Sequence, residues 1–97
     1  MATYIVLGNF TGQGIRNVKE TTKRAEAFKE MAQKAGVNVK EVYWTLGQYD
    51  LVTIVEAADE ETATLLGLSA CTLGNIRTQT LRAFSEEEIG PIIAKMP

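Results

Sequence analysis

Residues 39–57, VKEVYWTLGQYDLVTIVEA, decide the fold of this chain, and we interpret them as two β-strands joined by a tight turn. Both arms are rich in Val, Ile, Thr, Tyr and Trp, which are residue types that fit a pleated sheet. Gly47 supplies the backbone freedom that a short turn needs, so we expect a positive φ there. A two-residue turn at Gly47-Gln48 pairs Trp44 with Leu51 across the predicted hairpin.

This pairing gives the hairpin two different surfaces, because side chains alternate between the faces of a strand. The first surface is apolar and suits a layer of helices; it carries Val42, Trp44, Leu46, Leu51, Thr53 and Val55. The second mixes apolar, hydroxyl and carboxylate side chains; it carries Glu41, Tyr43, Thr45, Asp50, Val52, Ile54 and Glu56. A sheet that is apolar on both faces needs two covering layers. We therefore expect a further protein layer over the second surface, one that also encloses something polar.

The sequence before the hairpin predicts a strand and a helix. Thr3–Phe10 contains a run of consecutive apolar residues, as in a central strand, and residues 9–14 are expected to form a loop. A helix is expected from Thr21 or Thr22 to Ala35, with Thr21 as its N-cap and Gly36 after its last turn. The apolar positions of this helix recur at helical spacing and predict its buried face; they are Ala25, Phe28, Met31, Ala32 and Ala35. The charged residues of the helix, Arg24 among them, are expected to lie largely off that face.

After the hairpin, Asp59 is the expected N-cap of a second helix that Gly74 ends. Its apolar arc is wide, which predicts burial on more than one side; the residues are Ala63, Leu65, Leu66, Leu68, Ala70 and Leu73. Residues 75–84 predict an edge strand with one partly wet face. Ser85 and Glu88 form a capping-box pattern that opens a short C-terminal helix.

The predicted order is β-α-β-β-α-β followed by a small helix, an α+β arrangement of the ferredoxin-like kind with a four-stranded antiparallel sheet. The 97 residues form a single domain, 1–97. A chain of this length buries only about 60–70% of its unfolded surface, so association with a second copy would stabilise it.

Composition excludes several classes of function. The net charge of −2 disfavours nucleic acid and anionic membranes as partners, because both call for concentrated Lys and Arg. The chain has no histidine, which removes the usual metal ligand, general base and haem ligand. We therefore expect no metal and no cofactor. One cysteine, Cys71, and an N-terminus without a signal-peptide pattern favour a cytoplasmic protein.

At Gly47-Gln48-Tyr49-Asp50 the chain resembles the GYD-domain family, whose label comes from a Gly-x-Tyr-Asp element at this hairpin. The likeness covers most of the chain, since it includes residues 12–18, 43–46, 51–57 and 73–84. The resemblance implies a dimeric α+β barrel, in which two ferredoxin-like protomers put the exposed faces of their sheets together. It implies no particular reaction, because the family has no generally assigned activity.

Tyr49 and Asp50 are the sharpest candidates for a ligand site. In a functional interpretation, Asp50 is a polar anchor or an acid–base group at the mouth of a cavity, with Tyr49 beside it. In a structural interpretation, Asp50 binds backbone amides of the turn, as aspartate near turns often does, and Tyr49 packs over the hairpin.

Glu41, Tyr43, Thr45 and Glu56 share the mixed surface and are further candidates for binding a small polar or aromatic ligand. A carboxylate buried there would have a raised pKa and would be able to act as a base. The alternative is that Glu41 and Glu56 form ion pairs across the dimer, for example with Arg77 or Arg82.

Other conspicuous residues have structural interpretations. Trp44, Phe28 and Met31 are expected in the core. Cys71 is expected to be an inert buried thiol. Gly12-Gln13-Gly14 is too short for a phosphate-binding loop.

The sequence thus favours a homo-oligomeric module that binds a small ligand or has a structural role. The alternative is a cofactor-independent small-molecule enzyme, of monooxygenase or isomerase type, with a pocket between the sheet and the partner subunit. A third possibility is an effector-sensing module that acts through a partner, since the chain has no room for a helix-turn-helix.

Overall fold

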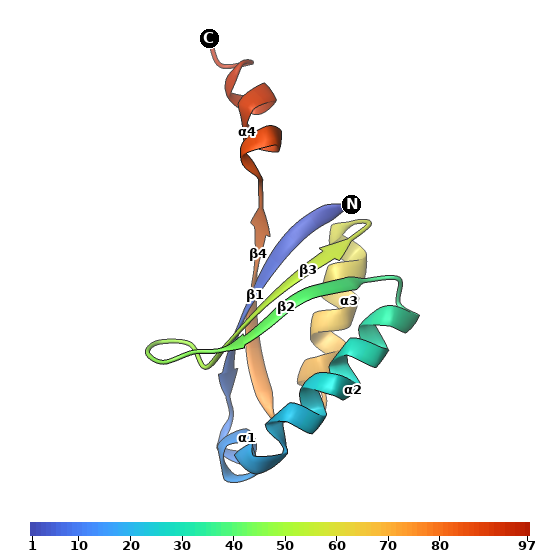
Figure 1. Ribbon diagram of the computed structural model, residues 1–97, viewed down its shortest axis with the longest axis vertical. Coiled ribbons are helices and arrows are strands. Elements are labelled where there is room, and N and C mark those ends of the chain that lie inside the picture. The colour runs from blue at the N-terminus through green and yellow to red at the C-terminus, as the bar shows by residue number, and fades with distance from the viewer.

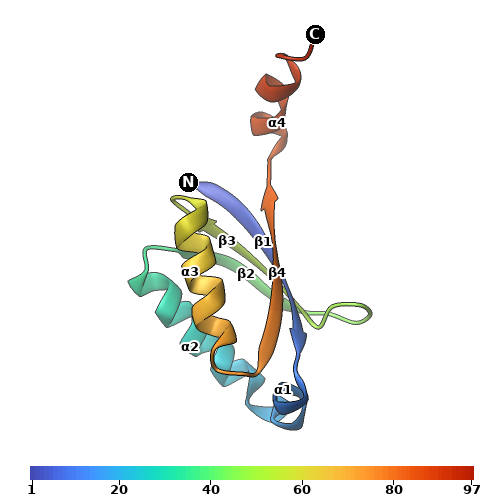
Figure 2. The ribbon, with the colours of Figure 1, turned by 180° about the vertical axis from the view of Figure 1, so that it is seen from behind.

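The computed structural model describes all 97 residues and confirms the ferredoxin-like order. The elements are β1 (Ala2–Phe10), α1 (Gly12–Arg16), a 3-10 helix η1 (Val18–Glu20), α2 (Thr21–Lys34), β2 (Asn38–Trp44), β3 (Leu51–Ala57), α3 (Glu60–Cys71), β4 (Ile76–Ala83) and α4 (Glu86–Ile93). The sheet is antiparallel with the order β2-β3-β1-β4, so β4 is the predicted edge strand. Helices α2 and α3 lie on the same face of the sheet (Figure 1 and, from behind, Figure 2).

The core lies between these two helices and the sheet. Tyr4 on β1 is paired with Val55 on β3, and both side chains are almost fully buried. Ala32 of α2 and Leu66 of α3 close the core from the helix side. Because side chains alternate along each strand, the residues next to Tyr4 and Val55 in sequence point to the opposite face of the sheet.

The hairpin has the predicted register but a longer connection than predicted. Trp44 pairs with Leu51, and Gly47 has a φ of 105°, as expected. The two-residue turn is wrong, because β2 ends at Trp44 and β3 begins at Leu51, which leaves residues 45–50 as a loop. Leu46, expected on the apolar surface, is fully exposed because this loop projects from the sheet away from α2 and α3 (Figure 1).

Helix α2 begins differently from the prediction. Thr21 is not its N-cap, because a 3-10 turn leads directly into the helix and Glu20 precedes it without a side-chain cap. The Thr21 hydroxyl instead accepts a hydrogen bond of 3.0 Å from Nε1 of Trp44. Trp44 is therefore no core residue: it lies across the start of α2 and is 43% exposed.

Residues 9–14 also differ from the prediction of a loop. Strand β1 continues to Phe10 and helix α1 begins at Gly12. Thr11 caps α1, because its hydroxyl accepts from the amide of Gly14 at 3.0 Å.

Helix α3 buries only one of its two apolar sides within the chain. Asp59 is its N-cap, as predicted, and its carboxylate accepts from the amide of Thr62 at 2.9 Å. The buried residues are Ala63, Leu66 and Ala70. The other side stays in solvent, where Leu65 is 61% and Leu68 is 63% exposed; Leu73, two residues beyond the end of the helix, is 59% exposed. The second burial that the wide apolar arc predicts is therefore absent from the single chain.

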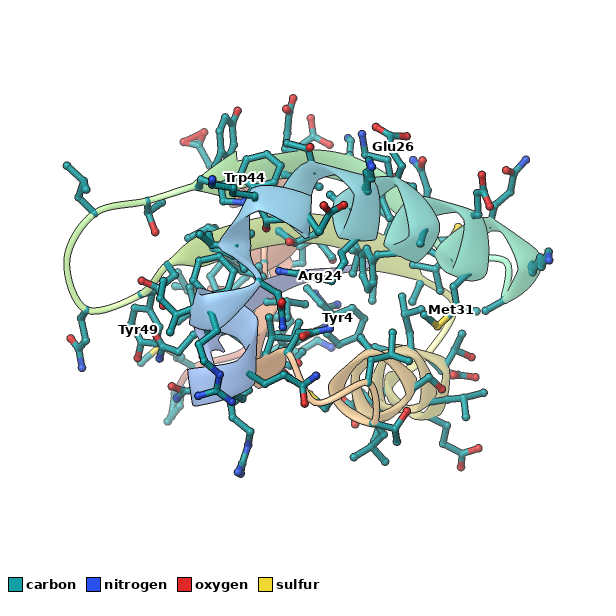
Figure 3. The ribbon with its side chains drawn as sticks, turned by 90° about the horizontal axis from the view of Figure 1, so that it is seen from below. Tyr4, Arg24, Glu26, Met31, Trp44 and Tyr49 are labelled. Atoms are coloured by element: carbon teal, nitrogen blue, oxygen red, sulfur yellow. The ribbon has the colours of Figure 1, made fainter.

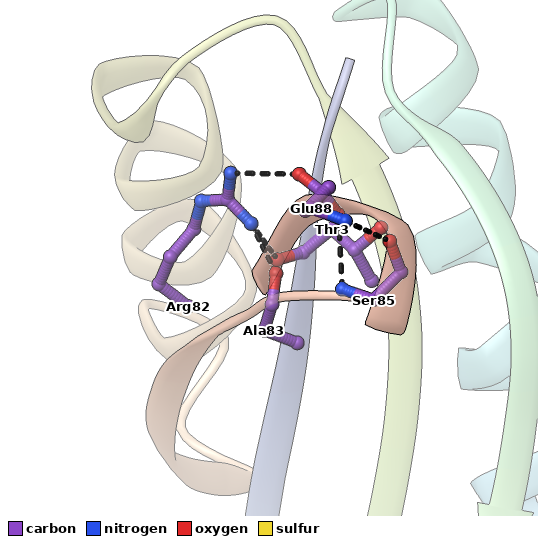
Figure 4. A network of polar contacts seen from close by, with 5 residues as sticks. All are labelled: Thr3, Arg82, Ala83, Ser85 and Glu88. Atoms are coloured by element: carbon purple, nitrogen blue, oxygen red, sulfur yellow. Dashed lines mark hydrogen bonds and ion pairs between the residues drawn. The ribbon is translucent and has the colours of Figure 1, made fainter. Parts of the chain in front are cut away.

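Strand β4 ends beside Thr3 of β1, and the chain then continues into α4, which lies away from the body of the protein (Figure 1). The predicted capping box is present, since Ser85 Oγ accepts from the amide of Glu88 and Glu88 Oε1 accepts from the amide of Ser85. Arg82 reaches Glu88 at 3.4 Å and the carbonyl oxygens of Thr3 and Ala83 (Figure 4). These contacts fix the direction of α4, although none of its residues is buried.

Candidate functional site

The face of the sheet opposite α2 and α3 has no covering element. Figures 1 and 2 show both helices on one side and nothing over the other. Register and alternation place apolar side chains of all four strands on this open face. The open face is defined by Ile5, Leu7, Tyr43, Val52, Ile54 and Leu81, with Glu41, Glu56 and Gln79 among them.

Glu41, Tyr43 and Glu56 lie together on the open face at its β2–β3 side, as the alternation predicts. Tyr43 pairs with Val52 and is half exposed, and Glu41 pairs with Ile54. Neighbours on β2 hold Glu56: the side-chain amide of Asn38 donates to it at 3.0 Å, and Lys40 Nζ lies 3.9 Å from its carboxylate. A β-bulge between Val39 and Glu41 brings Lys40 into this position.

Thr45, Tyr49 and Asp50 belong to the loop and not to the strands. The Thr45 hydroxyl donates to the carbonyl oxygen of Tyr49 at 2.6 Å. Asp50 accepts from the backbone amide of Phe10 on β1 at 2.9 Å. Tyr49 reaches across β1 to β4, where its hydroxyl donates to Oε1 of Gln79 at 3.1 Å.

The six candidate residues therefore form two groups. Asp50 binds a backbone amide, as in the structural interpretation, but that amide belongs to the neighbouring strand and not to the turn. Tyr49 borders the open face and ties the loop to β4. Glu56 has an ion-pair partner in its own chain, and Arg82, one of the two arginines expected to pair across a dimer, is occupied by Glu88.

Two carboxylates have altered acidity, and both sit at helix N-termini. The hydrogen bond from the Thr62 amide lowers the pKa of Asp59 below its ordinary value. The hydrogen bond from the Ser85 amide, followed by that from Arg82, lowers the pKa of Glu88. Each carboxylate stabilises the first turn of its helix in the ionised form.

Other reactive groups are few. Cys71 is half buried and not fully buried as expected, and its Sγ lies 3.4 Å from Oγ1 of Thr78. No three Cys, Asp or Glu side chains come together in a way that would hold a metal ion. None of the helices has the length and apolar character required to cross a bilayer.

Two apolar surfaces besides the open face were not predicted as such. The first is the leucine ridge of α3, defined by Leu65 and Leu68. The second is the C-terminal arm, defined by residues 84–97, on which four large apolar side chains are about half exposed or more: Phe84, Ile92, Ile93 and Met96. The wide apolar arc of α3 was the sequence signal for the ridge; the arm has no such signal, because its exposure depends on where β4 ends.

An antiparallel four-stranded sheet with two helices on one face and no covering layer on the other defines a ferredoxin-like α+β protein. The GYD domain family matches residues 4–93, and the chain belongs to this family. The resemblance stated from the hairpin motif is thereby confirmed.

The chain is similar to a protein of Thermus thermophilus that is named glutamine synthetase and cystathionine beta-lyase binding protein. The two are 34% identical over 97 residues, which is 99% of each chain.

Solved structures support the same fold. The crystal structure of TTHA0845 from Thermus thermophilus has a TM-score of 0.63 and 31% identity, over 88% of this chain and 95% of that one. FFRP-DM1 has a TM-score of 0.61 at 24% identity, over 87% and 100% of the two chains. A hypothetical protein from Pyrococcus horikoshii has a TM-score of 0.57 at 23% identity, over 89% and 93%. The last two show likeness of fold alone.

Proposed function

We propose that this chain is a homodimeric binding module that docks onto a larger metabolic enzyme. The observation that carries the proposal is the Thermus thermophilus relative, which is named for binding glutamine synthetase and cystathionine beta-lyase and aligns over nearly the whole chain. The partner proposed for this chain is an enzyme of one of these two kinds. The apolar surfaces of the fold suggest how self-association and partner binding are divided between its faces.

The open face is the proposed dimer interface. A single chain leaves this face without a covering layer: Tyr43 and Leu81 are exposed, and Ile5, Val52 and Ile54 between them are partly exposed. An apolar surface of this kind commonly marks an interface. Two copies with their open faces together would form the dimeric α+β barrel that the resemblance to the GYD-domain family implies. Glu41, Tyr43 and Glu56 would then border the space between the subunits, where a small polar ligand would find both donors and acceptors.

The C-terminal arm also supports the proposal that a second copy of the chain covers the open face. Helix α4 leaves the body in a fixed direction, because Arg82 and the capping box hold its first turn. It then exposes Ile92 and Ile93 to solvent. In the proposed dimer, the arm of each protomer packs against the partner's subunit and buries these side chains.

The leucine ridge of α3 is the proposed surface for the enzyme partner. Helix α3 lies on the side of the sheet opposite the open face (Figure 2), and Leu65 and Leu68 are exposed, so they stay accessible when two sheets pack together. Leu65 and Leu68 are neighbours on the helix surface, being three residues apart. Their exposure suits an apolar contact with a partner of larger size.

Two substitutions test the dimer interface and the partner surface separately. Ile54→Glu places two carboxylates in a symmetric interface, and since burying an unpaired charge costs several kcal/mol we expect the dimer dissociation constant to rise at least 100-fold. Leu68→Glu should keep the dimer but remove binding to the purified enzymes. Leu46→Glu, a change of the same type on the exposed loop tip, is the control for both.

Sedimentation equilibrium at micromolar protein measures the dimer, and surface plasmon resonance against purified glutamine synthetase and cystathionine beta-lyase measures the partner. A stable monomer of the unaltered chain would overturn the dimer. Binding of neither enzyme, or equal binding by Leu68→Glu and Leu46→Glu, would overturn the proposed partner surface.

A further inference from the structure

A cavity of about 140 Å³ lies between α2, α3 and the helix-covered face of the sheet. Its walls are mostly apolar; they include Val6, Phe28, Met31, Val55 and Leu66. An apolar cavity of about 150 Å³ holds one benzene molecule in a well-studied engineered protein. The space therefore matches a ligand whose apolar body has about six non-hydrogen atoms.

Arg24 supplies the only charge in the walls of this cavity. Figure 3 shows its side chain turned inward from α2, whereas Glu26 on the same helix points to solvent. Nη1 of Arg24 donates to the carbonyl oxygen of Asn17 at 3.0 Å. Nη2 is buried and has no hydrogen-bond partner in the protein.

A buried guanidinium nitrogen without an acceptor is unfavourable, because burial removes its water without a compensating hydrogen bond. Such groups are rare in folded proteins and call for an explanation. None of the residues that line the cavity is an Asp or a Glu, so its walls offer Arg24 no carboxylate. The charge and the apolar walls together describe the complement of the site: a negatively charged group attached to a hydrocarbon body.

We propose that this cavity binds a small monocarboxylate with an apolar body, aromatic or branched aliphatic, whose carboxylate accepts hydrogen bonds from Nη2 of Arg24. Guanidinium and carboxylate are planar groups of matching geometry. Phosphate and sulfate fit the site less well, because a strongly hydrated anion would lose its water against carbon walls. The hydroxyl of Thr53, a buried polar residue of β3, lines the same space and offers a second polar contact.

This site is separate from the proposed function. It lies on the helix-covered face of the sheet, whereas the proposed dimer uses the open face. Its test therefore succeeds or fails whatever the oligomeric state or the enzyme partner.

The test uses benzoate as the probe, with benzyl alcohol as a neutral molecule of similar shape and inorganic phosphate as an anion without an apolar body. We expect benzoate to shift the methyl resonance of Met31 and the Nε resonance of Arg24 in a saturable manner. Benzyl alcohol should bind at least ten-fold more weakly, and phosphate should produce no saturable shift at either residue. If benzoate and branched aliphatic carboxylates such as isovalerate all leave both resonances unchanged, a buried water satisfies Arg24 and the proposal is overturned.

Arg24→Met keeps the length of the side chain and removes its charge. We expect Arg24→Met to weaken the binding of benzoate at least ten-fold while benzyl alcohol binds as before. Unchanged binding of benzyl alcohol would also show that the cavity is still formed. The matched control is Lys23→Met, because Lys23 is the adjacent cation, its side chain is 82% exposed, and its partner is Glu20 at 3.3 Å. Unchanged benzoate binding in Arg24→Met, or an equal loss in Lys23→Met, would overturn the proposal.

Discussion

Substituting Gly14 tests whether α1 is seated against the start of β4 as the structure describes. A Cβ on Gly14 would lie 1.9 Å from the carbonyl oxygen of Asn75 and 2.8 Å from its carbonyl carbon. Real Cβ atoms essentially never approach a neighbour below 3.0 Å, so in Gly14→Ala the two backbone segments must separate by about 1 Å. Neither segment is a flexible side chain that would move aside.

That separation breaks the hydrogen bonds that join the two segments. The amide of Thr11 donates to the carbonyl of Asn75 at 3.0 Å, the Thr11 hydroxyl donates to the carbonyl of Gly74, and Nε2 of Gln13 donates to Oδ1 of Asn75 at 3.0 Å. Each bond contributes about 1 kcal/mol, so the free energy of unfolding should fall by about 3 kcal/mol. For a domain of this size the melting temperature should fall by about 12–24 °C.

The control is Gly12→Ala, two residues earlier in the same helix. Its Cβ would meet only the end of the flexible Arg16 side chain, at 3.3 Å, so we expect a change within about 1 kcal/mol. Urea denaturation and calorimetry of both variants at pH 7 measure the difference. A loss below about 1 kcal/mol in Gly14→Ala, or an equal loss in Gly12→Ala, would refute the close contact.

Three further predictions concern the helices. Gly67→Ala in α3 should raise the free energy of unfolding by about 1 kcal/mol, because its Cβ would meet nothing within 4 Å and alanine favours helix; a lower melting temperature in calorimetry would contradict this. Asp59 has a lowered pKa, so its ionised carboxylate contributes to the stability of the folded chain at neutral pH. This contribution begins to fall as the pH drops below about 4, the ordinary value, and is lost once the pH is below the folded-state pKa. Asp59→Asn caps equally well but does not titrate, so it should lose less stability than the unaltered chain between pH 7 and pH 3 in urea titrations, and an identical loss would contradict the assignment. Trp44→Phe should lower the free energy of unfolding by about 0.5–1 kcal/mol, because it removes the hydrogen bond from Trp44 to Thr21. In a double-mutant cycle with Thr21→Val the two losses should not add, and strict additivity would contradict that hydrogen bond.

Patterns confined to neighbouring residues could be predicted from the sequence. Centring the turn on Gly47-Gln48 predicted the pairing of Trp44 with Leu51, and the spacing of Ser85 and Glu88 predicted the capping box, because both depend on local geometry. The loop at residues 45–50 could not be predicted in the same way. Its ends are held by long-range contacts, such as Asp50 with the amide of Phe10, which no local pattern reveals.

The prediction that Arg24 lies off the apolar face of its helix is wrong. Its position relative to Phe28 and Met31, four and seven residues later, lies on the same helical stripe, so periodicity alone places it with the apolar residues. The charge of the side chain led to the opposite assignment. A cation at an apolar position of a helix is informative, because its side chain must either extend the charged end to solvent or bind a partner.

The positions of the apolar surfaces determine how many interfaces the protein needs. A two-fold dimer uses the same patch on both copies, so two open sheet faces can cover each other. Helix α3, which carries the leucine ridge, lies on the opposite side of the sheet (Figures 1 and 2), so the ridge is not part of that contact. If the sheet face makes the dimer, Leu65 and Leu68 require a different occupant, and each dimer presents two such ridges. A partner enzyme with several identical subunits would then be held at two points, and disrupting the dimer with Ile54→Glu should weaken the partner's apparent affinity even though Ile54 never touches it.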